Sequence, residues 1–272
     1  MATMKAKGRV LIVAGSDSGG GAGIQADIKA VTALGGYAAT AVTALTAQNT
    51  LGVFGIHDVP PAFVVQQMDV VLSDIGADAI KTGMLHNAAL IDAVCDLIES
   101  KARAVPLVVD PVMVAKGGTA LLEPSASATL KRRLTLIATV LTPNIPEAVA
   151  LTGMTINDLP SMRSAAEVLL TIGPRAVLLK GGHLPSHEVH DILVTPDHVE
   201  VFTSPRIDTQ HTHGTGCALS SAIATGLAQG LGLRDAVVRA RAYVREAILA
   251  APGLGKGHGP LGLGHTVKPF TG

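Results

Sequence analysis

The sequence predicts an α/β protein built on a doubly wound, mostly parallel sheet. Short apolar runs alternate along the chain with longer segments of helical periodicity, and most of the short runs are continuously apolar. Parallel strands that helices cover on both faces have this composition. The strand–helix alternation implies right-handed crossovers between parallel strands. We see no linker, low-complexity stretch or internal repeat, so we expect one domain over residues 1–272.

The predicted elements alternate over the first 180 residues and then change character. Strands are expected at 10–14, 39–47, 79–82, 107–109, 139–141 and 176–179. Helices are expected between them, near 22–35, 61–74, 87–100, 124–135, 145–152 and 161–172. Residues 190–203 predict a hairpin that turns at Pro196-Asp197. Two helices, near 216–231 and 234–251, and a loop tail rich in Gly and Pro complete the chain.

The composition allows a large core and argues against nucleic-acid binding. Of 272 residues, 48% are hydrophobic and 15% charged, which is enough for one large buried core. Lys+Arg and Asp+Glu both number 21, so the formal net charge is zero and the chain lacks an electrostatic footprint for nucleic acid. Aromatic residues make up only 2%, with no Trp, which leaves little for base stacking.

Neither a membrane span nor a secreted disulfide framework is expected. The mean hydropathy is +0.42, but no run approaches the roughly 20 apolar residues that a span needs. The apolar run 10–14 is too short for a secretion signal. The two cysteines, Cys95 and Cys217, do not make a disulfide framework, and Cys95 fits core packing in a helix. We therefore expect a reduced, cytoplasmic setting.

Polar residues and glycines collect where the predicted strands end. In a doubly wound sheet, ligands bind beyond the carboxyl ends of the strands. These segments follow six of the strands: 15–17, 48–49, 82–84, 110–113, 143–144 and 180–183. Each segment taken singly fits a turn, but their coincidence on one rim predicts a ligand site.

A glycine-bearing loop, 211–217, runs directly into the predicted helix near 216–231. Gly214 and Gly216 lack side chains, so backbone N–H groups beside Thr215 can approach a ligand closely. The helix start adds unpaired donors and a partial positive charge, which together suit a phosphate. Cys217 follows, where a helix start is expected to stabilise a thiolate. The alternative is a Gly-rich turn that caps a core helix.

Three common site patterns are tested and disfavoured. Residues 21–26 fit G-x-G-x-x-A, but no acid that could hold a ribose occurs between Asp27 and Asp58, which disfavours a nicotinamide dehydrogenase. A P-loop motif is absent from the sequence. His211 and His213 lack partners at metal-ligand spacing, so zinc is not expected.

Asp27 is a carboxylate on an apolar helix face. At 3.6 residues per turn, the face of the first helix consists of Ile24, Ile28, Val31 and Leu34, and Asp27 projects within it. A carboxylate there must be paired or must face a polar pocket, and we favour the pocket. The alternative is a helix-start acid that the helix dipole stabilises.

Four further polar residues have both a functional and a structural interpretation. Gln48 offers a donor and an acceptor to a heterocycle edge, or closes a turn. Asp110 suits Mg²⁺ or a phosphate-bound water, or an Asp-Pro turn. Glu147 suits Mg²⁺ through water, or a capping box with Asn144. Lys180 suits nucleotide phosphates, or solvent at a strand end.

The longest motifs span nearly the whole chain: 14–27, 43–50, 81–85, 110–113, 142–144, 179–183, 211–217 and 257–260. In these stretches the chain resembles the hydroxymethylpyrimidine/phosphomethylpyrimidine kinases of thiamine biosynthesis, a family of the ribokinase-like superfamily. The resemblance implies a three-layer α/β/α fold with a mostly parallel central sheet. It implies ATP- and Mg²⁺-dependent phosphorylation of 4-amino-5-hydroxymethyl-2-methylpyrimidine and then of its monophosphate, and a homodimer.

The resemblance also implies a role for each site residue. The residues expected around the pyrimidine are Gln48 at its edge and Asp27, Gly15, Met84 and Val112 in the pocket. Those expected at the phosphates are Asp110 and Glu147 for Mg²⁺, Lys180 for ATP, and Gly214, Thr215 and Gly216 for the transferring phosphoryl group. Most ribokinase-like enzymes carry Asp as base where this chain has Cys217. We expect Cys217 beside the reacting hydroxyl, either taking its proton or orienting it.

Two other functions compete with this one. A pyridoxine/pyridoxal kinase of the same superfamily would also act on a hydroxymethyl group of a six-membered heteroaromatic ring, although Gln48 and Cys217 favour the pyrimidine. A non-catalytic pyrimidine-binding module is disfavoured because Lys180 and Asp110 are present. In each case we expect a small-molecule ligand, without nucleic acid or membrane.

Overall fold

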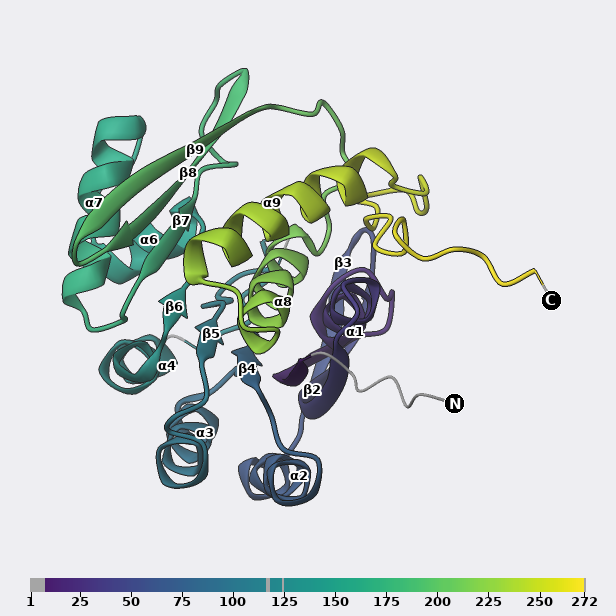
Figure 1. Ribbon diagram of the computed structural model, residues 1–272, viewed down its shortest axis with the longest axis vertical. Coiled ribbons are helices and arrows are strands. Elements are labelled where there is room, and N and C mark those ends of the chain that lie inside the picture. The colour runs from purple at the N-terminus through teal and green to yellow at the C-terminus, as the bar shows by residue number, and fades with distance from the viewer. Residues whose placement is uncertain (1–7, 116–117, 124, 272) are drawn as a thin grey trace.

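In the described part of the structure, a computed structural model, nine strands lie in one sheet with the order β3-β2-β1-β4-β5-β6-β7-β8-β9 (Figure 1). The structure describes residues 8–115, 118–123 and 125–271. The strands are β1 Arg9–Asp17, β2 Tyr37–Asn49, β3 Gly52–Asp58, β4 Ala79–Thr82, β5 Leu107–Val109, β6 Val140–Leu141, β7 Val177–Lys180, β8 Glu188–Thr195 and β9 His198–Pro205. The six strands from β2 to β7 in sheet order are parallel, whereas β3, β8 and β9 pair antiparallel. The predicted α/β class with a mostly parallel sheet is confirmed.

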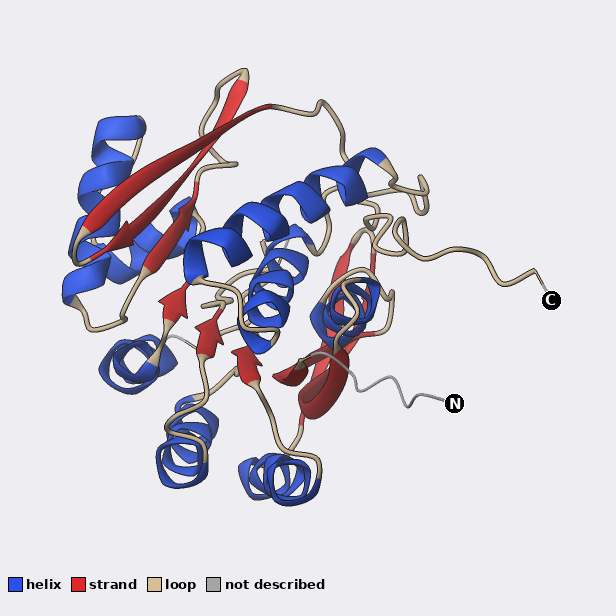
Figure 2. Ribbon diagram, viewed as in Figure 1, coloured by secondary structure: helices blue, strands red, loops and turns tan. Residues whose placement is uncertain are grey.

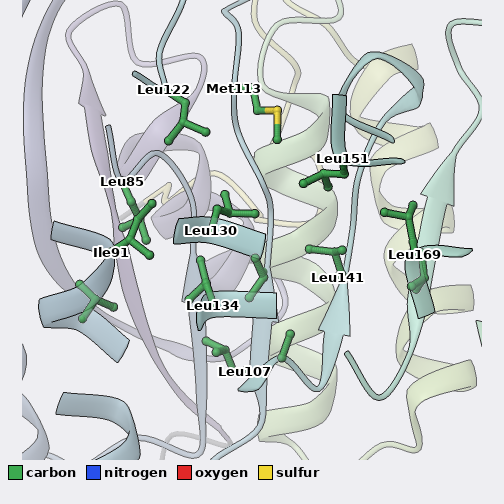
Figure 3. Packing of buried hydrophobic residues seen from close by; sticks show 14 of the residues in the cluster. Leu85, Ile91, Leu107, Met113, Leu122, Leu130, Leu134, Leu141, Leu151 and Leu169 are labelled. Atoms are coloured by element: carbon green, nitrogen blue, oxygen red, sulfur yellow. The ribbon is translucent and has the colours of Figure 1, made fainter. Parts of the chain in front are cut away.

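Helices cover both faces of the sheet, as Figure 2 shows. They are α1 Gly23–Ala33, α2 Pro61–Asp74, α3 Ala88–Lys101, α4 Ala126–Thr129, α5 Thr135–Ile137, α6 Ile145–Thr152, α7 Leu159–Thr171, α8 Thr215–Ala228 and α9 Leu233–Leu249. One apolar layer packs α2, α3, α4, α6 and α7 against the sheet, and Figure 3 shows part of it, with Leu107 of β5 and Leu141 of β6 near Leu134. The other layer packs α1, α8 and α9 against the opposite face.

Strand β3 is absent from the predicted elements. It pairs antiparallel with β2, with Gln48 opposite Val53, and forms one edge of the sheet. Gly52, Gly55 and exposed side chains break the alternation that marks a strand, so pairing with β2 rather than local propensity creates it.

Two predictions about helices are wrong in detail. The helix expected near 124–135 is interrupted by a π-helical turn, Leu130–Leu134, between α4 and α5, and residue 124 lies outside the described residues. Such turns depend on packing, which periodicity does not register. In α1 the buried residues are Ala26, Asp27, Ala30 and Val31, while Ile28 of the predicted face is 37% exposed. Small alanines let α1 pack closely on one side of the predicted face, so only Ile28 departs from it.

The topology places a switch point at β1. Strand β1 lies between β2 and β4, so the chain reverses its direction of travel across the sheet at β1. Helix α8 packs over β1, β4 and β5 at this position. A ligand site is expected beyond the carboxyl ends of the strands at such a switch point. None of the described helices is both long enough and apolar enough to span a bilayer.

Candidate active site

The N-terminus of α8 lies where several strand ends meet. A Cβ placed on Gly216 would lie 3.1 Å from Nζ of Lys180 and 3.5 Å from Oδ2 of Asp110, so the end of β7 and the segment after β5 face this helix start. Asn144, after β6, forms a bridge with Lys180. The structure therefore brings together four of the predicted phosphate-site positions: Asp110, Glu147, Lys180 and Gly216.

Lys180 and Asp110 form a close ion pair. Nζ of Lys180 donates to Oδ1 of Asp110 at 2.9 Å, and the hydroxyl of Thr142 lies 3.3 Å from the same oxygen. The side chains are only 13% and 3% exposed. Burial opposes the ammonium, but the carboxylates of Asp110 and Glu147 outweigh it and raise the pKa of Lys180. Lys180 is therefore a paired, charged group facing the site rather than a lysine in solvent.

Glu147 forms the capping box that was its structural alternative. Its Oε2 accepts from the backbone N–H of Asn144 at 2.7 Å, and Oδ1 of Asn144 accepts from the N–H of Glu147 at 2.9 Å. Burial, reinforced by Asp110 and opposed by Lys180, raises the pKa of Glu147 to about 7. A cation near Glu147 would stabilise its charged form and so lower its pKa. The carboxylate can therefore cap the helix and face a metal ion at the same time.

The carboxylates near α8 fit a Mg²⁺ site that is completed by substrate phosphates and water. Within the described ranges, no group of three or more His, Cys, Asp or Glu side chains could hold a metal ion. Mg²⁺ commonly binds through one or two carboxylates together with substrate phosphates and water. Asp110 and Glu147, which interact electrostatically, fit that mode rather than an all-protein cage.

Glycine occupies positions 214 and 216 of the loop for different structural reasons. Gly214 caps α8 with φ +83°, and a Cβ there would lie 1.9 Å from the carbonyl oxygen of Gly21. Gly214 is thus required by backbone packing, and its predicted contact with the transferring phosphoryl group stays a prediction. Gly216 instead opens toward Lys180. It lies in the first turn of α8, where backbone N–H groups of a helix start can bind an anion.

The thiolate expected at Cys217 is wrong. Burial raises the pKa of the Cys217 thiol to about 12, against the opposing effect of Lys81 and with reinforcement from Asp27 and Asp110. The helix start that was expected to lower the pKa does not compensate for desolvation and two nearby carboxylates. Cys217 is a neutral thiol at pH 7.

Asp27 is paired and enclosed. Nζ of Lys81 donates to both of its oxygens, at 2.9 and 2.8 Å, and Oγ of Ser221 donates to Oδ1 at 2.7 Å. Both charged side chains are 0% exposed. The paired alternative therefore describes Asp27 in this structure, while its contact with substrate stays a prediction.

Lys81 was assigned no role from the sequence. Burial opposes its charge, but Asp27, Cys217 and Asp110 raise the pKa of Lys81 above its ordinary value. The sequence did contain a signal for this pair. A lysine within a four-residue buried strand needs a carboxylate partner, and Asp27 was a carboxylate without an assigned partner on an apolar helix face. The Asp27–Lys81 pair lies close enough to Cys217 to affect its charge.

The predicted pyrimidine pocket is partly assembled. A Cβ on Gly15 would lie 3.2 Å from Sδ of Met84, and Met84 packs in a small apolar cluster with Val112. A hollow beside this cluster is lined by Gln48, Asn49, Thr50, Gly52, Val53, Ala115, His213 and His258. Val53 and Ala115 belong to both, so the hollow that Gln48 lines adjoins the apolar cluster. A more open hollow, between α7 and the β8–β9 turn, contains none of the predicted site residues.

The sequence placed Asp17 and His213 in predicted site segments but assigned neither of them a role in the site. Nε2 of His213 lies 2.9 Å from Oδ2 of Asp17 and 3.3 Å from Nε2 of Gln48. A Cβ on Gly21 would lie 2.6 Å from the His213 ring, so this glycine of the G-x-G-x-x-A pattern makes room for a histidine rather than for a dinucleotide. The pair joins residues 196 positions apart, which no local pattern could reveal.

Comparison with known proteins agrees with the geometry. Residues 17–262 match the phosphomethylpyrimidine kinase family. The chain is 46% identical to the hydroxymethylpyrimidine/phosphomethylpyrimidine kinase of Bacillus subtilis over 93% of each chain. It is 57% identical to a thiamine biosynthesis bifunctional protein of Geobacter sulfurreducens over 94% of its own length, but spans only 52% of that relative.

Solved structures give the same fold. The phosphomethylpyrimidine kinase of Clostridium difficile matches with a TM-score of 0.79 and 40% identity, over 89% of this chain and 100% of that one. The pyridoxal kinase of Staphylococcus aureus in complex with ADP matches with a TM-score of 0.89 and 33% identity, over 97% and 96%. The family match and the identities to the pyrimidine kinases give the same assignment: the chain belongs to the phosphomethylpyrimidine kinase family.

Proposed function

We propose that this protein transfers a phosphoryl group from ATP to the hydroxymethyl group of 4-amino-5-hydroxymethyl-2-methylpyrimidine and then to the resulting monophosphate, in thiamine biosynthesis. The observation that carries the proposal is the buried Lys180–Asp110 pair at the N-terminus of α8, beside the open position of Gly216. Phosphoryl transfer requires alignment and charge neutralisation more than covalent chemistry. A lysine, a helix start and two carboxylates on one rim can supply both.

The phosphate groups would be held by the elements around α8. Lys180 lies against the ATP phosphates as a point charge. The segment Gly214–Gly216, with Thr215 between the glycines, presents the helix start to the transferring phosphoryl group. Asp110 and Glu147 would hold Mg²⁺, which supplies additional neutralisation of phosphate charge when bound.

The alcohol would be held by groups on the other side of α8. Gln48 binds the pyrimidine edge, and the surface formed by Gly15, Met84 and Val112 contacts the ring. Because the Cys217 thiol is neutral, it orients the hydroxyl group rather than accepting its proton. Asp27 is expected to line the pyrimidine pocket, and it also holds the Lys81 ammonium, whose charge acts on Cys217.

A coupled assay of ADP formation tests the proposal with the pyrimidine alcohol, its monophosphate and pyridoxal in parallel. We expect the highest kcat/KM for the two pyrimidines. A clear preference for pyridoxal would instead support the second candidate, which the fold match to pyridoxal kinase favours. Pyrimidine binding without turnover would support a non-catalytic module.

Two further properties are proposed on the family resemblance alone. We expect a homodimer that works in the cytoplasm. Light scattering coupled to size-exclusion chromatography measures the assembly, and a mass of 27.6 kDa in solution would contradict the dimer.

A further inference from the structure

Asp191 is a buried carboxylate outside the predicted site residues. It lies within β8, is only 8% exposed, and stands opposite Lys180 in the last residue pair between β7 and β8. Its Oδ1 accepts from the backbone N–H of Gly181 at 3.0 Å, and its Oδ2 accepts from Nε of Arg241 at 2.7 Å. One carboxylate therefore joins an arginine of α9 to the backbone immediately after Lys180.

Gly181 marks the point where the chain leaves the sheet after β7. A Cβ on Gly181 would lie 1.9 Å from the carbonyl oxygen of His190, so the backbone of β8 approaches too closely for any other residue. Strand β7 ends at Lys180, and the side chain of Asp191 supplies the acceptor for the next N–H. Buried N–H groups need such a partner. Asp191 therefore helps to determine the path of the chain beyond Lys180.

The peptide units on both sides of Lys180 are held by hydrogen bonds. The N–H of Lys180 donates to the carbonyl oxygen of Pro143 at 2.8 Å. The N–H of Gly181 belongs to the planar peptide that follows Lys180, so its direction depends on the ψ angle of Lys180. Backbone angles in turn decide which side-chain rotamers are allowed. By accepting from Gly181, Asp191 restrains this angle and with it the direction of the Lys180 side chain.

Arg241 neutralises Asp191 and fixes its orientation. The side chains of the pair are 16% and 11% exposed. The guanidinium also lies over the ring of Phe202, with Cζ 5.2 Å from the ring centroid, and its Nη2 is 3.4 Å from Oγ of Ser204. A carboxylate this little exposed would be costly without a partner. Each oxygen of Asp191 thus has its own donor, and the carboxylate stays charged at the end of β7.

The loop that follows Gly181 has a separate anchor. Arg206 donates to three backbone carbonyl oxygens within residues 182–186, at 2.9, 2.6 and 2.6 Å. The loop is therefore held whether or not Asp191 is present. The contribution of Asp191 is confined to the peptide between this loop and Lys180.

We propose that Asp191, held by Arg241, is a positioning residue that orients Lys180 toward the phosphate groups of ATP. The inference rests on the proposed function, in which Lys180 contacts these phosphates. Lys180 is restrained at both ends, because Asp191 holds the peptide after it and Asp110 accepts from its ammonium at 2.9 Å. A charge whose position is fixed in advance loses little freedom when the ligand binds, which strengthens binding.

The test compares the affinities of two double variants for a non-hydrolysable ATP analogue with Mg²⁺, measured by titration calorimetry. Asp191→Asn with Arg241→Met removes the ion pair but keeps an acceptor for Gly181, and should bind within about threefold of the wild type. Asp191→Leu with Arg241→Met removes the acceptor as well and should bind about tenfold more weakly, the equivalent of one lost hydrogen bond. Because both variants lack the two charges, the difference between them reports the acceptor.

A further pair of measurements shows whether the effect passes through Lys180. In a Lys180→Met background, Asp191→Leu with Arg241→Met should weaken binding by no more than about twofold, because the group that Asp191 positions is gone. The control is another ion pair between α9 and the β8–β9 hairpin, Arg234 with Glu200 at 2.8 Å. Arg234→Met with Glu200→Leu should leave the affinity for the analogue unchanged.

The outcomes separate this inference from the proposed function. A wild type that binds the analogue but phosphorylates neither pyrimidine would overturn the proposed function alone, and one that does not bind the analogue would overturn both. Equal affinities of the Asn and Leu variants, or the same loss with and without Lys180, would overturn the inference alone. If the Leu variant does not fold, Asp191→Ala with Arg241→Met removes the same acceptor and takes its place.

Discussion

Individual residues of the site owe their identity to different physical demands, although they look alike in the sequence. Gly214 and Gly216 both read as glycines that admit a ligand. Only Gly216 opens toward Lys180, whereas Gly214 adopts a left-handed conformation against the backbone of Gly21. Sequence position and surroundings also disagree for Cys217. Its position at a helix start suggests a thiolate, but its surroundings keep the thiol neutral.

The two glycines predict opposite phenotypes. Gly214→Ala should destabilise the protein by about 2–4 kcal/mol, because the methyl group meets the Gly21 carbonyl at a positive φ. Gly216→Ala should unfold near the wild-type temperature but lower kcat about 10- to 100-fold by displacing Lys180. Thermal unfolding and the coupled kinase assay measure both. Equal losses of stability in the two variants would contradict this distinction.

The Cys217 thiol predicts a pH response. Because its pKa is raised to about 12, the reactive thiolate is scarce at neutral pH and increases only as the pH rises. Alkylation of Cys217 by iodoacetamide should stay slow between about pH 6 and 9, and kcat should show no titration from this group there. Cys217→Ala should bind ATP nearly normally but turn over slowly. Peptide mass spectrometry follows the alkylation, with urea-unfolded protein as the reactive control; rapid alkylation of the folded protein at pH 7 would refute the neutral thiol.

At the scale of elements, the Asp27–Lys81–Ser221 cluster joins α1, β4 and α8 beneath the site. Helix α8 begins at Thr215, directly after its N-cap Gly214, so the ion pair helps to fix the position of the helix start relative to the sheet. A buried pair is costly to assemble and still more costly to break by removing one partner. The cluster therefore links stability to the geometry of the site.

A double-mutant cycle tests this link. Lys81→Met should cost about 3–5 kcal/mol, because it leaves the Asp27 charge buried without its partner. Adding Asp27→Asn should recover about 1–3 kcal/mol of that loss. The exposed pair Arg163–Glu167 on α7, with the same charges at 3.0 Å, is the control and should couple by less than about 1 kcal/mol. Urea unfolding gives each value, and equal coupling in the two pairs would argue against a structural role for the buried pair.

At the scale of the whole molecule, one nine-stranded sheet with an apolar layer on each face positions every part of the site. The strand order reverses at β1, so loops from both halves of the sheet meet α8 at one edge (Figure 1). Individual charges stabilise the site, but over the entire chain the acidic and basic residues balance and the formal net charge is zero.

That balance predicts solution behaviour. With a sequence pI near 7.2, electrostatic repulsion between molecules is smallest close to neutral pH. We expect a solubility minimum near that pH and higher solubility on either side. Light scattering across a pH series at constant ionic strength measures it, and a monotonic trend through neutral pH would contradict the expectation.

The sequence by itself determined the α/β class, most of the strands and helices, and the rim on which the site residues gather, because periodicity and turn residues act over short stretches of chain. It also carried the motifs that assign the family. It did not reveal β3, the π-helical turn after α4 or the exposure of Ile28 in α1, since these depend on pairing and packing between elements.

Only the tertiary structure decided which polar groups pair. Lys81 with Asp27 and His213 with Asp17 are contacts between residues 54 and 196 positions apart, and both were absent from the predicted site. The ionisation of Cys217 was likewise beyond the sequence, since desolvation and neighbouring charges depend on what the fold places around a group. The chain specifies which chemical groups are available, and the packed structure sets their partners and their charge.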